Sequence, residues 1–397
     1  RSATASARGL LVKRLLVGFE TGLGVMLLVT AALLVTSFAR LVTADKGFTE
    51  DAVVGLEVVL PEARYQRLAE RLQIKERLIE AVAALPGVAS AGVSNTLPLQ
   101  GEVWLDSIGA EGNTAPPAEW PLANYRPVNP DYFRTLGIPL RQGRLFSEAD
   151  RERNLALVSE TTARRMWPGQ DPVGKRFRHA NPADPPFEVA GVVGDIRGIR
   201  LDQDPGLMVY VPHWKRTQSR ISLLVRTPLD PAALSGALRE AVRKLDPEAA
   251  VAEVKTMRSI VEESTAERRF QVTLAAAFAL AALALAALGV YGVVSYSVAS
   301  RINEMGIRLA LGAGAGRLYA LVLWQGMLPV AAGIAAGVAG ALAAGSLLRS
   351  LLFGVNPHDP VTIAFAVALL GAVAGAACWL PARRAVRVDP AVALRAE

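Results

Sequence analysis

The distribution of charge constrains this chain more than any other feature of its sequence. Four stretches lack Asp, Glu, Lys and Arg and are rich in Leu, Val, Ala, Gly and Phe: Thr21–Ala39, Phe270–Ser300, Leu318–Leu348 and Pro360–Ala382. Each is at least about 19 residues long, which is enough for an α-helix to cross a bilayer core. The segment between the first and second stretches is polar. The sequence therefore predicts a membrane protein with one helix, a large outer domain and then three helices.

The average composition conceals this arrangement, because 52% hydrophobic and 20% charged residues are close to an ordinary soluble protein. The net charge of +7 comes from basic residues that flank the charge-free stretches. They are Arg1, Arg8, Lys13 and Arg14 before the first stretch, Arg301, Arg308 and Arg317 after the second, and Arg383, Arg384, Arg387 and Arg395 after the fourth. Between the third and fourth stretches, Arg349 is the one Lys or Arg residue.

This asymmetry predicts the topology. By the positive-inside rule, both termini and the 301–317 loop are cytoplasmic, whereas the 42–269 domain and the 349–359 loop lie outside. The basic excess is then a signal of topology and of contact with lipid headgroups. No base-stacking aromatic pattern accompanies it, so nucleic acid is not an expected partner.

Two simpler explanations of the apolar stretches are disfavoured. The first stretch is longer than a usual signal-peptide core and its cleavage site is weak, which favours a membrane anchor. Three later charge-free stretches of over about 20 residues are unusual for helices buried in a soluble core. Cys378 is the single cysteine. No intrachain disulfide is possible, and the outer domain must be stable through its own core.

The outer domain shows two strand–helix–strand patterns around an insertion. The first comprises Val53–Leu60, Glu62–Leu85 and Val88–Ser94, and the second comprises Ile221–Arg226, Pro231–Leu245 and Ala250–Val254. Together they predict a split ferredoxin-like α+β lobe. The 100–215 insertion is rich in Pro and Gly and has short apolar strands such as Leu155–Ser159 and Phe187–Val193, so we expect a second, mostly β lobe.

These elements give three expected domains. Residues 1–41 form a cytoplasmic segment and the first membrane helix, 42–269 form the two-lobed outer domain, and 270–397 form a three-helix membrane domain with cytoplasmic loop and tail. Hinges are expected near 42–50 and 257–268.

The sequence offers little catalytic chemistry. The segment Gly169–Lys175 matches a phosphate-binding P-loop up to its last position, where Arg176 replaces the hydroxyl that Mg²⁺ requires. The residues after it are poor helix formers, so a tight turn is favoured. His179, His213 and His358 have no second ligand at i+3 or i+4, and neither a metal nor another cofactor is expected.

Two acidic residues also have structural explanations. Asp195 follows an apolar strand and is expected in a turn or cap rather than in a catalytic site. Glu20 begins the first membrane stretch, and we expect its side chain to extend to the interface rather than to function within the membrane.

The loop Arg301–Arg317 is the sharpest local feature. Glu304 and Arg308 lie four residues apart on one helix face, and Ile302, Met305 and Leu309 form an apolar stripe. The pattern predicts a short helix at the inner membrane surface. Either a cytosolic partner binds this helix or it is a simple interfacial helix, and its residues leave both interpretations open.

Small residues four apart occur in two membrane stretches, where they let helix backbones approach closely. The pairs are Gly333 with Gly337, and Gly371 with Gly375. An Ala- and Gly-rich composition produces such pairs by chance, so helix packing and coincidence are both open. Pro329 is expected to kink the third stretch.

Four segments resemble MacB/FtsX-type ABC transporter permeases. Asn303–Ala313 and Leu380–Arg395 are similar to the permease part of that family, while Asn129–Arg144 and Trp167–Arg176 are similar to its MacB-like periplasmic core domain. The resemblance covers essentially the whole chain. It departs from the family at Asn303 and in the glycines of 312–316. The opening sequence, which begins with Arg1, resembles the second half of acidobacterial duplicated permeases.

This resemblance implies a non-catalytic permease subunit in the bacterial inner membrane, with both termini cytoplasmic. A separate cytosolic ABC ATPase dimer would push the 301–313 helix and so move the outer domain to drive export. The residues implied in this coupling are Arg301, Glu304, Met305, Gly306, Arg308, Leu309 and Gly312. Other implied partners are membrane lipid, a second permease half or copy, and a periplasmic adaptor or outer-membrane channel. The alternative is an FtsX-like signalling protein that regulates an extracytoplasmic partner such as a cell-wall hydrolase.

Overall fold

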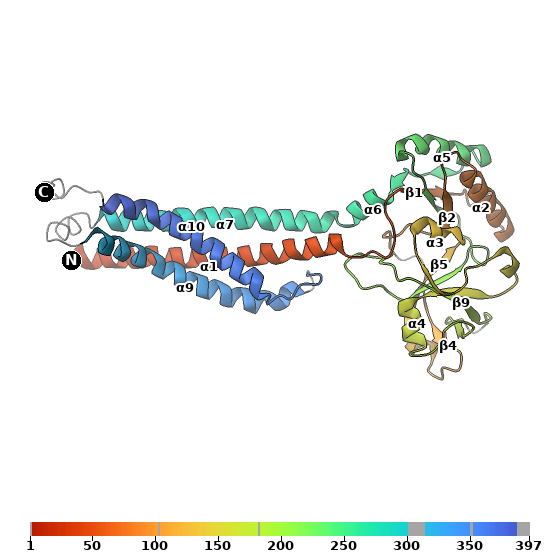
Figure 1. The fold of residues 1–397 in the computed structure, drawn as a ribbon, viewed down its shortest axis with the longest axis horizontal. Coiled ribbons are helices and arrows are strands. Elements are labelled where there is room, and N and C mark those ends of the chain that lie inside the picture. The colour runs from red at the N-terminus through yellow and green to blue at the C-terminus, as the bar shows by residue number, and fades with distance from the viewer. Residues whose placement is uncertain (1, 102–103, 182, 301–313, 350–351, 387–397) are drawn as a thin grey trace. The chain divides into compact units, whose positions relative to one another are not determined.

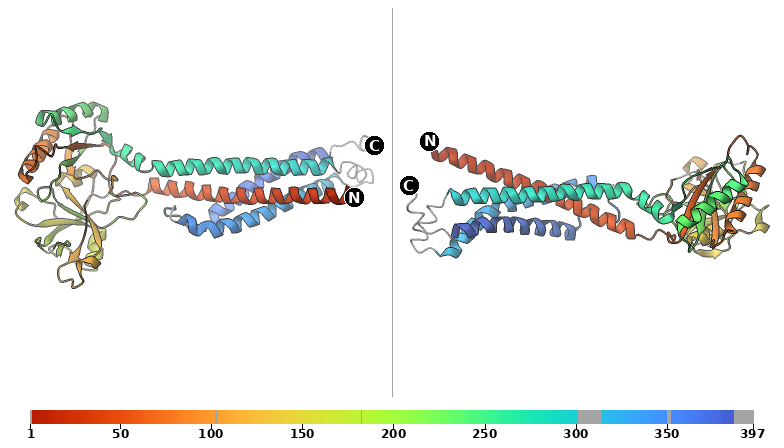
Figure 2. Two further views of the ribbon diagram at one scale, coloured as in Figure 1. Left: turned by 180° about the vertical axis from the view of Figure 1, so that it is seen from behind. Right: turned by 90° about the horizontal axis from the view of Figure 1, so that it is seen from above.

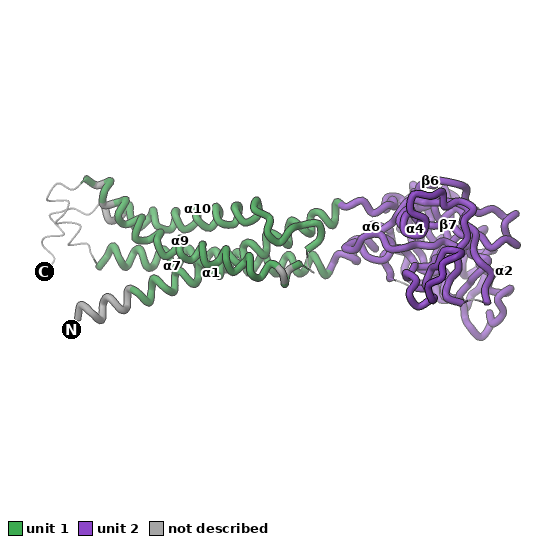
Figure 3. Tube along the Cα trace, turned by 90° about the horizontal axis from the view of Figure 1, so that it is seen from below, with its two compact units in different colours: residues 1–43, 267–397 green, residues 44–266 purple. Residues whose placement is uncertain are grey.

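The computed structural model describes residues 2–101, 104–181, 183–300, 314–349 and 352–386. The chain divides into two compact units (Figure 3). One contains the residues up to Thr43 and those from Glu267 onward, and the other contains Ala44–Ala266. Each unit is described by itself.

The first unit consists of long apolar helices, seen from two further sides in Figure 2. They are α1 (Ser2–Thr43), α7 (Ala266–Ala299), α9 (Ala315–Leu348) and α10 (Pro360–Val386). Each of these four is long and apolar enough to cross a membrane, which confirms the predicted pattern of one helix followed by three. α9 continues through Pro329 as one helix.

A common apolar core joins these helices. α1 contacts both α9 and α10. The buried side chains are mostly small or β-branched, which lets the helices approach closely: Val25 and Val29 of α1, Val290 and Val294 of α7, Val330 of α9, and Ala374 and Cys378 of α10. This core holds the four segments together, although more than 200 residues separate α1 from α7.

The second unit begins with the predicted ferredoxin-like lobe. Its sheet has the strand order β12-β1-β11-β2, with β13 pairing onto β1. All of these pairs are antiparallel. The strands are β1 (Val53–Val59), β2 (Ser90–Ser94), β11 (Arg220–Arg226), β12 (Ala250–Val251) and β13 (Lys255–Thr256). Helix α2 (Leu68–Ala83) follows β1, and α5 (Pro231–Leu245) follows β11. The two strand–helix–strand units therefore interleave in one sheet, as the fold prediction required.

Helix α2 begins six residues later than the sequence pattern suggested. Pro61 starts a turn in its place, because the amides of Arg64 and Tyr65 both donate to the Pro61 carbonyl, at 3.1 and 3.2 Å. The predicted strand Ala250–Val254 is likewise shorter, and the chain re-enters the sheet as β13.

The inserted lobe is mostly β, as predicted. Its eight-stranded sheet has the order β3-β5-β10-β7-β9-β8-β4, and β6 pairs with β9. β5 with β10 and β7 with β9 are parallel pairs. The strands are β3 (Leu105–Ser107), β4 (Gly109–Ala110), β5 (Leu122–Val128), β6 (Leu140–Gly143), β7 (Leu155–Ser159), β8 (Arg176–Arg178), β9 (Phe187–Val193) and β10 (Met208–Pro212). Helices α3 (Asp131–Leu136) and α4 (Glu160–Met166) and the 3-10 turns η1 (Pro117–Glu119) and η2 (Glu148–Asp150) complete it.

The ferredoxin-like sheet is covered on both faces. Helices α2 and α5 cover one face (Figure 1), where Leu78 and Leu238 pack with Leu56 and Leu223 of the central strands. On the other face, α3 brings Tyr132, Phe133 and Leu136 against Leu224 of β11. Burial on both sides explains why β1 and β11 are nearly continuous apolar runs rather than alternating ones.

Candidate functional site

The predicted coupling loop cannot be placed by the structure. Residues 301–313 lie outside the described part of the chain. All seven predicted coupling residues therefore remain sequence-based predictions: Arg301, Glu304, Met305, Gly306, Arg308, Leu309 and Gly312.

The glycine pair of α9 lies against a matching pair in α1. A Cβ on Gly337 would stand 2.5 Å from the carbonyl oxygen of Gly22 and 2.8 Å from the Val25 Cβ. A Cβ on Gly333 would stand 2.8 Å from the Thr21 Cβ and would also collide with the Gly18 carbonyl oxygen. Neither position has room for a side chain without a backbone shift, and the two helices are in direct backbone contact.

The predicted glycine pair of α10 makes no such close contact with a described residue. Built Cβ atoms on Gly371 and Gly375 meet no described atom within 4 Å. Packing at Gly371 and Gly375 therefore stays a prediction. Gly18 and Gly22 of α1 were not among the predicted packing residues, although they have the same four-residue spacing as Gly333 and Gly337.

Glu20 packs toward a neighbouring helix. A Cβ on Gly289 of α7 would overlap the Glu20 Oε2, so this glycine leaves room for the carboxylate. Lys13 lies two turns earlier in α1, with its Nζ 3.5 Å from the centre of the Tyr296 ring. The α1–α7 contact therefore contains a half-buried carboxylate as well as apolar side chains.

The outer domain begins with a short docked segment, residues 44–50, which we call the strap. It follows directly after the last residue of α1. The Lys46 carbonyl accepts from the Arg197 amide at 2.9 Å, and the Thr49 amide donates to the Leu136 carbonyl at 2.7 Å. Phe48 packs against the core around α3. The strap is thus fixed at both ends to the inserted lobe.

Two left-handed glycines make this docking possible. Gly47 in the strap has φ +73°, and a Cβ there would overlap the backbone carbonyl of Asp195. Gly137 ends α3 with φ +69°, and a Cβ there would stand 2.7 Å from the Thr49 Oγ1. Since both the φ values and the close approaches disfavour any side chain, glycine is required on each side of the contact.

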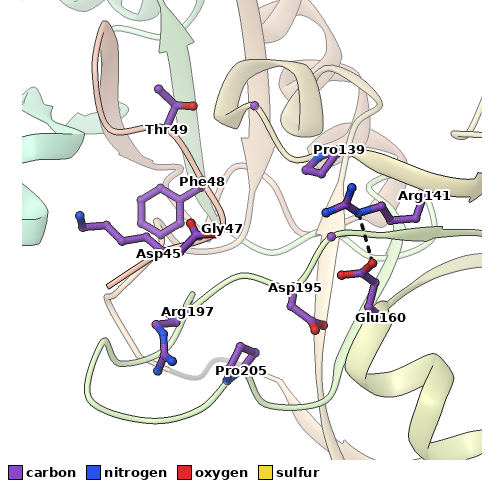
Figure 4. A pocket seen from close by; sticks show the side chains of 13 residues that line it. Asp45, Gly47, Phe48, Thr49, Pro139, Arg141, Glu160, Asp195, Arg197 and Pro205 are labelled. Atoms are coloured by element: carbon purple, nitrogen blue, oxygen red, sulfur yellow. Dashed lines mark hydrogen bonds and ion pairs between the residues drawn. The ribbon is translucent and has the colours of Figure 1, made fainter. Parts of the chain in front are cut away.

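A pocket of about 430 Å³ lies beside the strap. Figure 4 shows the strap and Phe48 on one side, and Arg141, Glu160 and Asp195 on the other. Arg141 Nε lies 3.2 Å from Glu160 Oε1. The lining charges balance, with three carboxylates and three cations: Asp45, Glu160 and Asp195, and Lys46, Arg141 and Arg197. This balance favours a structural joint over a site for a charged ligand.

Asp195 serves as a cap, as its sequence context predicted. Its carboxylate accepts from the Thr161 amide at 2.8 Å and from the Thr161 hydroxyl at 2.7 Å, at the start of α4. Arg164 Nη2 donates to it at 3.0 Å. Asp195 therefore ties α4 to the chain segment that receives the strap.

The second connection to the membrane helices is also ordered. Helix α6 (Met257–Ser264) packs on β1 and buries Met257 and Ile260. Only Thr265 separates it from α7. Arg258 Nη2 lies 2.6 Å from Asp51 Oδ1, just beyond the strap. The boundaries between the two units, after Thr43 and after Ala266, fall within the ranges 42–50 and 257–268 where hinges were expected. Movement at these hinges stays a prediction.

The remaining sequence candidates form no catalytic centre among the described residues. The Gly169–Lys175 segment is a turn that leads into strand β8, so no helix N-terminus faces it. Among the described residues, no three His, Cys, Asp or Glu side chains lie together in a way that could hold a metal ion. His179 pairs with Asp184, with Nε2 3.0 Å from Oδ2.

A group of basic side chains, of which Lys75 and His213 are buried, lies where α2 meets the inserted lobe. Lys75 of α2 is 2% exposed, and burial lowers the pKa of its ammonium to about 8. Burial, followed by the charges of Lys75 and Arg151, lowers the pKa of His213 to about 3. Arg151 lies over the Trp214 ring, 5.4 Å from its centre, and pairs with Glu76 at 2.6 Å. His213 is therefore neutral at physiological pH, whereas Lys75 is charged at a cost to stability.

The sequence matches the models of two protein families. Residues 21–245 match the MacB-like periplasmic core domain, which is more than half of the chain, and residues 276–390 match the FtsX-like permease C-terminal domain. The chain belongs to the MacB/FtsX family of ABC transporter permeases. Members of this family are transmembrane permease components, and the four apolar helices agree with a multi-pass protein of the inner membrane.

Named relatives are similar over much of this permease. A macrolide export ATP-binding/permease protein MacB from Rhodospirillum rubrum is 28% identical over 338 residues, which are 80% of this chain and 48% of the relative. A MacB from Azoarcus sp. is 29% identical over 270 residues, 65% of this chain and 40% of the relative. A pyoverdine export protein PvdT from Pseudomonas syringae is 28% identical over 280 residues, with 65% and 40% coverage. The chain thus spans about half the length, or less, of these curated relatives.

Two solved structures are also similar. The periplasmic region of MacB from Actinobacillus actinomycetemcomitans aligns with a TM-score of 0.39 and 16% identity, covering 56% of this chain and 97% of that one. The extracellular domain of the noncanonic ABC-type transporter YknZ from Gram-positive bacteria aligns with a TM-score of 0.34 and 17% identity, covering 50% and 100%.

Proposed function

We propose that this permease couples ATP hydrolysis by a separate cytosolic ATPase to movement of its outer domain, and that this movement drives export of a substrate. The family membership supports the general role. Matched relatives are export proteins that combine ATP-binding and permease functions. In this assembly the present chain supplies the permease function, and a partner chain supplies ATP hydrolysis.

The docked strap is the observation that carries the proposal. α1 is one continuous helix up to Thr43, and the strap that follows is bonded to the inserted lobe at Lys46 and Thr49. A flexible linker would absorb a displacement of α1 without passing it to the outer domain. A strap held by two short backbone hydrogen bonds and two glycine contacts passes the displacement to α3 and to the end of β9 within a few residues.

We further propose that the 301–313 loop receives the motion on the cytoplasmic side. Glu304 and Arg308 offer charges to a partner surface, and Gly306 allows close approach because it has no side chain. A second copy or a second permease half would complete the assembly, with a periplasmic adaptor or outer-membrane channel as a further partner.

The test replaces residues of that loop. Gly306→Trp and Glu304→Lys should abolish transport and release or uncouple the ATPase, with expression and membrane insertion intact. Co-purification of the ATPase with each variant, together with a transport assay, measures both effects. Full transport and full ATPase retention in both variants would show that the loop is a passive interfacial helix. Retained coupling without any exported substrate, but with a changed activity of an extracytoplasmic hydrolase, would instead support FtsX-like signalling.

A further inference from the structure

The inserted lobe contains a second cleft, which shares no lining residue with the strap pocket. It has a volume of about 810 Å³ and lies where the end of α4 and the turn before β8 face β4 and the residues that follow β4. Helix α4 and strand β4 lie in the same part of that lobe in Figure 1. Sites for small molecules commonly have volumes of about 300–1,000 Å³, so the cleft is large enough for one.

The charges that line this cleft are unbalanced. Arg165, Lys175 and Arg176 are exposed in it, whereas Glu111 is its one lining carboxylate. None of these four residues forms an ion pair with another described residue. Many other arginines of the domain are paired, as in Arg144–Asp150 at 2.6 Å and Arg151–Glu76 at 2.6 Å. Three unpaired cations in one concavity favour an anionic ligand.

The cleft also has an apolar wall. Pro121, Met166 and Trp167 line it. Trp167 is 6% exposed and packs edge-on against Phe177, with ring centroids 6.4 Å apart. Its position is therefore set by the core of the lobe. A ligand with an apolar group beside its charge would contact this wall.

The backbone that carries two of the cations is fixed. The Gly174 amide donates to the Val189 carbonyl at 2.8 Å, and the Val189 amide donates to the Lys175 carbonyl at 2.9 Å. The Arg176 carbonyl accepts from the Glu111 amide at 2.9 Å. Because β9 holds this turn, the two side chains start from defined positions, which lowers the entropic cost of binding.

We propose that this cleft binds small anions that carry an apolar group. Arg165, Lys175 and Arg176 hold the acidic group, which can be a carboxylate, sulfonate or phosphate, and Met166 and Trp167 contact the apolar part. This site requires neither ATP nor Mg²⁺, and it is independent of the proposed coupling mechanism. The segment Gly169–Lys175 then supplies a positive charge at the edge of the cleft, and it does not act as a P-loop.

Calorimetric titration of the full chain in nanodiscs of zwitterionic lipid tests the proposal. Naphthalene-2-sulfonate should bind with a Kd below about 1 mM, while methanesulfonate and 2-naphthalenemethanol should each bind at least about tenfold more weakly. Equal binding of methanesulfonate would overturn the role of the apolar wall and would indicate a site for free anions. Equal binding of the neutral alcohol would overturn the role of the cations.

Matched variants distinguish the cleft from general attraction by the basic surface. The triple variant Arg165→Gln, Lys175→Gln and Arg176→Gln should weaken sulfonate binding at least about tenfold, and Glu111→Gln should tighten it. Arg77→Gln, Arg239→Gln and Arg243→Gln together remove the same charge from exposed positions of α2 and α5. This control should bind like the wild type. Equal loss in both triple variants, or unchanged binding in the cleft variant, would overturn the proposal.

Discussion

The Gly337 backbone of α9 lies so near Gly22 of α1 that a Cβ on Gly337 would stand 2.5 Å from the Gly22 carbonyl oxygen. We predict that Gly337→Ala destabilises the membrane unit by about 1–3 kcal/mol, because the added methyl group forces the helices apart. Gly292→Ala in α7 is the control, since its Cβ would meet no described atom within 4 Å and no packing role is predicted for it. It should change stability by less than about 0.5 kcal/mol. Thermal unfolding in detergent measures both, and equal shifts in Tm would contradict the prediction.

Gly47→Ala should free the strap from the inserted lobe. Gly47 and Gly112 both have positive φ, so alanine is strained at either position, but only at Gly47 would the Cβ overlap another backbone. We expect hydrogen exchange of the Thr49 and Arg197 amides to accelerate at least about tenfold in Gly47→Ala, because their hydrogen bonds open more often. Gly112→Ala should leave both amides protected. Unchanged exchange in Gly47→Ala would show that the strap tolerates a side chain.

The same Gly47→Ala variant should lower ATP-driven transport while ATP hydrolysis continues. A strap that detaches still allows α1 to move, but it no longer passes the movement to α3 and β9. Simultaneous assays of hydrolysis and transport, compared with Gly112→Ala, check this expectation. Transport at the wild-type level from a variant whose strap amides exchange rapidly would show that motion reaches the outer domain by another route, such as α6.

Lys75→Met should stabilise the outer domain at neutral pH. Burial holds the pKa of Lys75 at about 8, below its ordinary value of 10.5. Between these values the unfolded chain binds more protons, so the wild-type free energy of unfolding rises with pH from about 8 to 10.5 and is lowest below 8. The difference corresponds to about 3 kcal/mol. Lys75→Met should remove this rise, as measured by tryptophan fluorescence during denaturant unfolding at several pH values. An unchanged pH dependence would mean that Lys75 is hydrated in the native state.

The topology can be tested by cysteine labelling after Cys378→Ala. Ala149→Cys should react with a membrane-impermeant maleimide added to intact cells lacking an outer membrane barrier, whereas Ser300→Cys should react only after lysis. Both positions are exposed in the structure. The prediction rests on the Lys/Arg asymmetry of the loops. The reverse labelling pattern would show that the protein has the opposite orientation in the membrane.

The membrane helices and the ferredoxin-like lobe could be predicted because each leaves a local signal. A span needs an uninterrupted apolar length, and the Pro231–Leu245 helix and the Phe187–Val193 strand have the bounds that their sequence patterns indicated. The start of α2 was predicted wrongly because the residues after Pro61 suit a helix, while their amides bond to Pro61 instead.

Contacts between segments that lie far apart in the sequence were harder to predict from it. Gly18 and Gly22 show the right spacing, but only the structure reveals that they face Gly333 and Gly337. The strap could not be predicted at all, because Gly47 lies against Asp195 and Thr49 lies against Gly137, and both partners are far along the chain. The cations of the second cleft come from α4, the turn after it and β8, and no local pattern links Arg165 to Lys175.

The strand order of the ferredoxin-like sheet has a consequence for biosynthesis. β1 and β2 do not pair with each other, because β11 lies between them in the sheet. β12 and β13, which also pair with β1, are synthesised after β11. At about 5–20 residues per second, β1 waits roughly 10–30 s for β11, which is roughly 160 residues away. Every strand of the inserted lobe is synthesised in that interval. The inserted lobe can therefore complete its sheet first, while two apolar strands remain as open edges that invite aggregation if synthesis stalls.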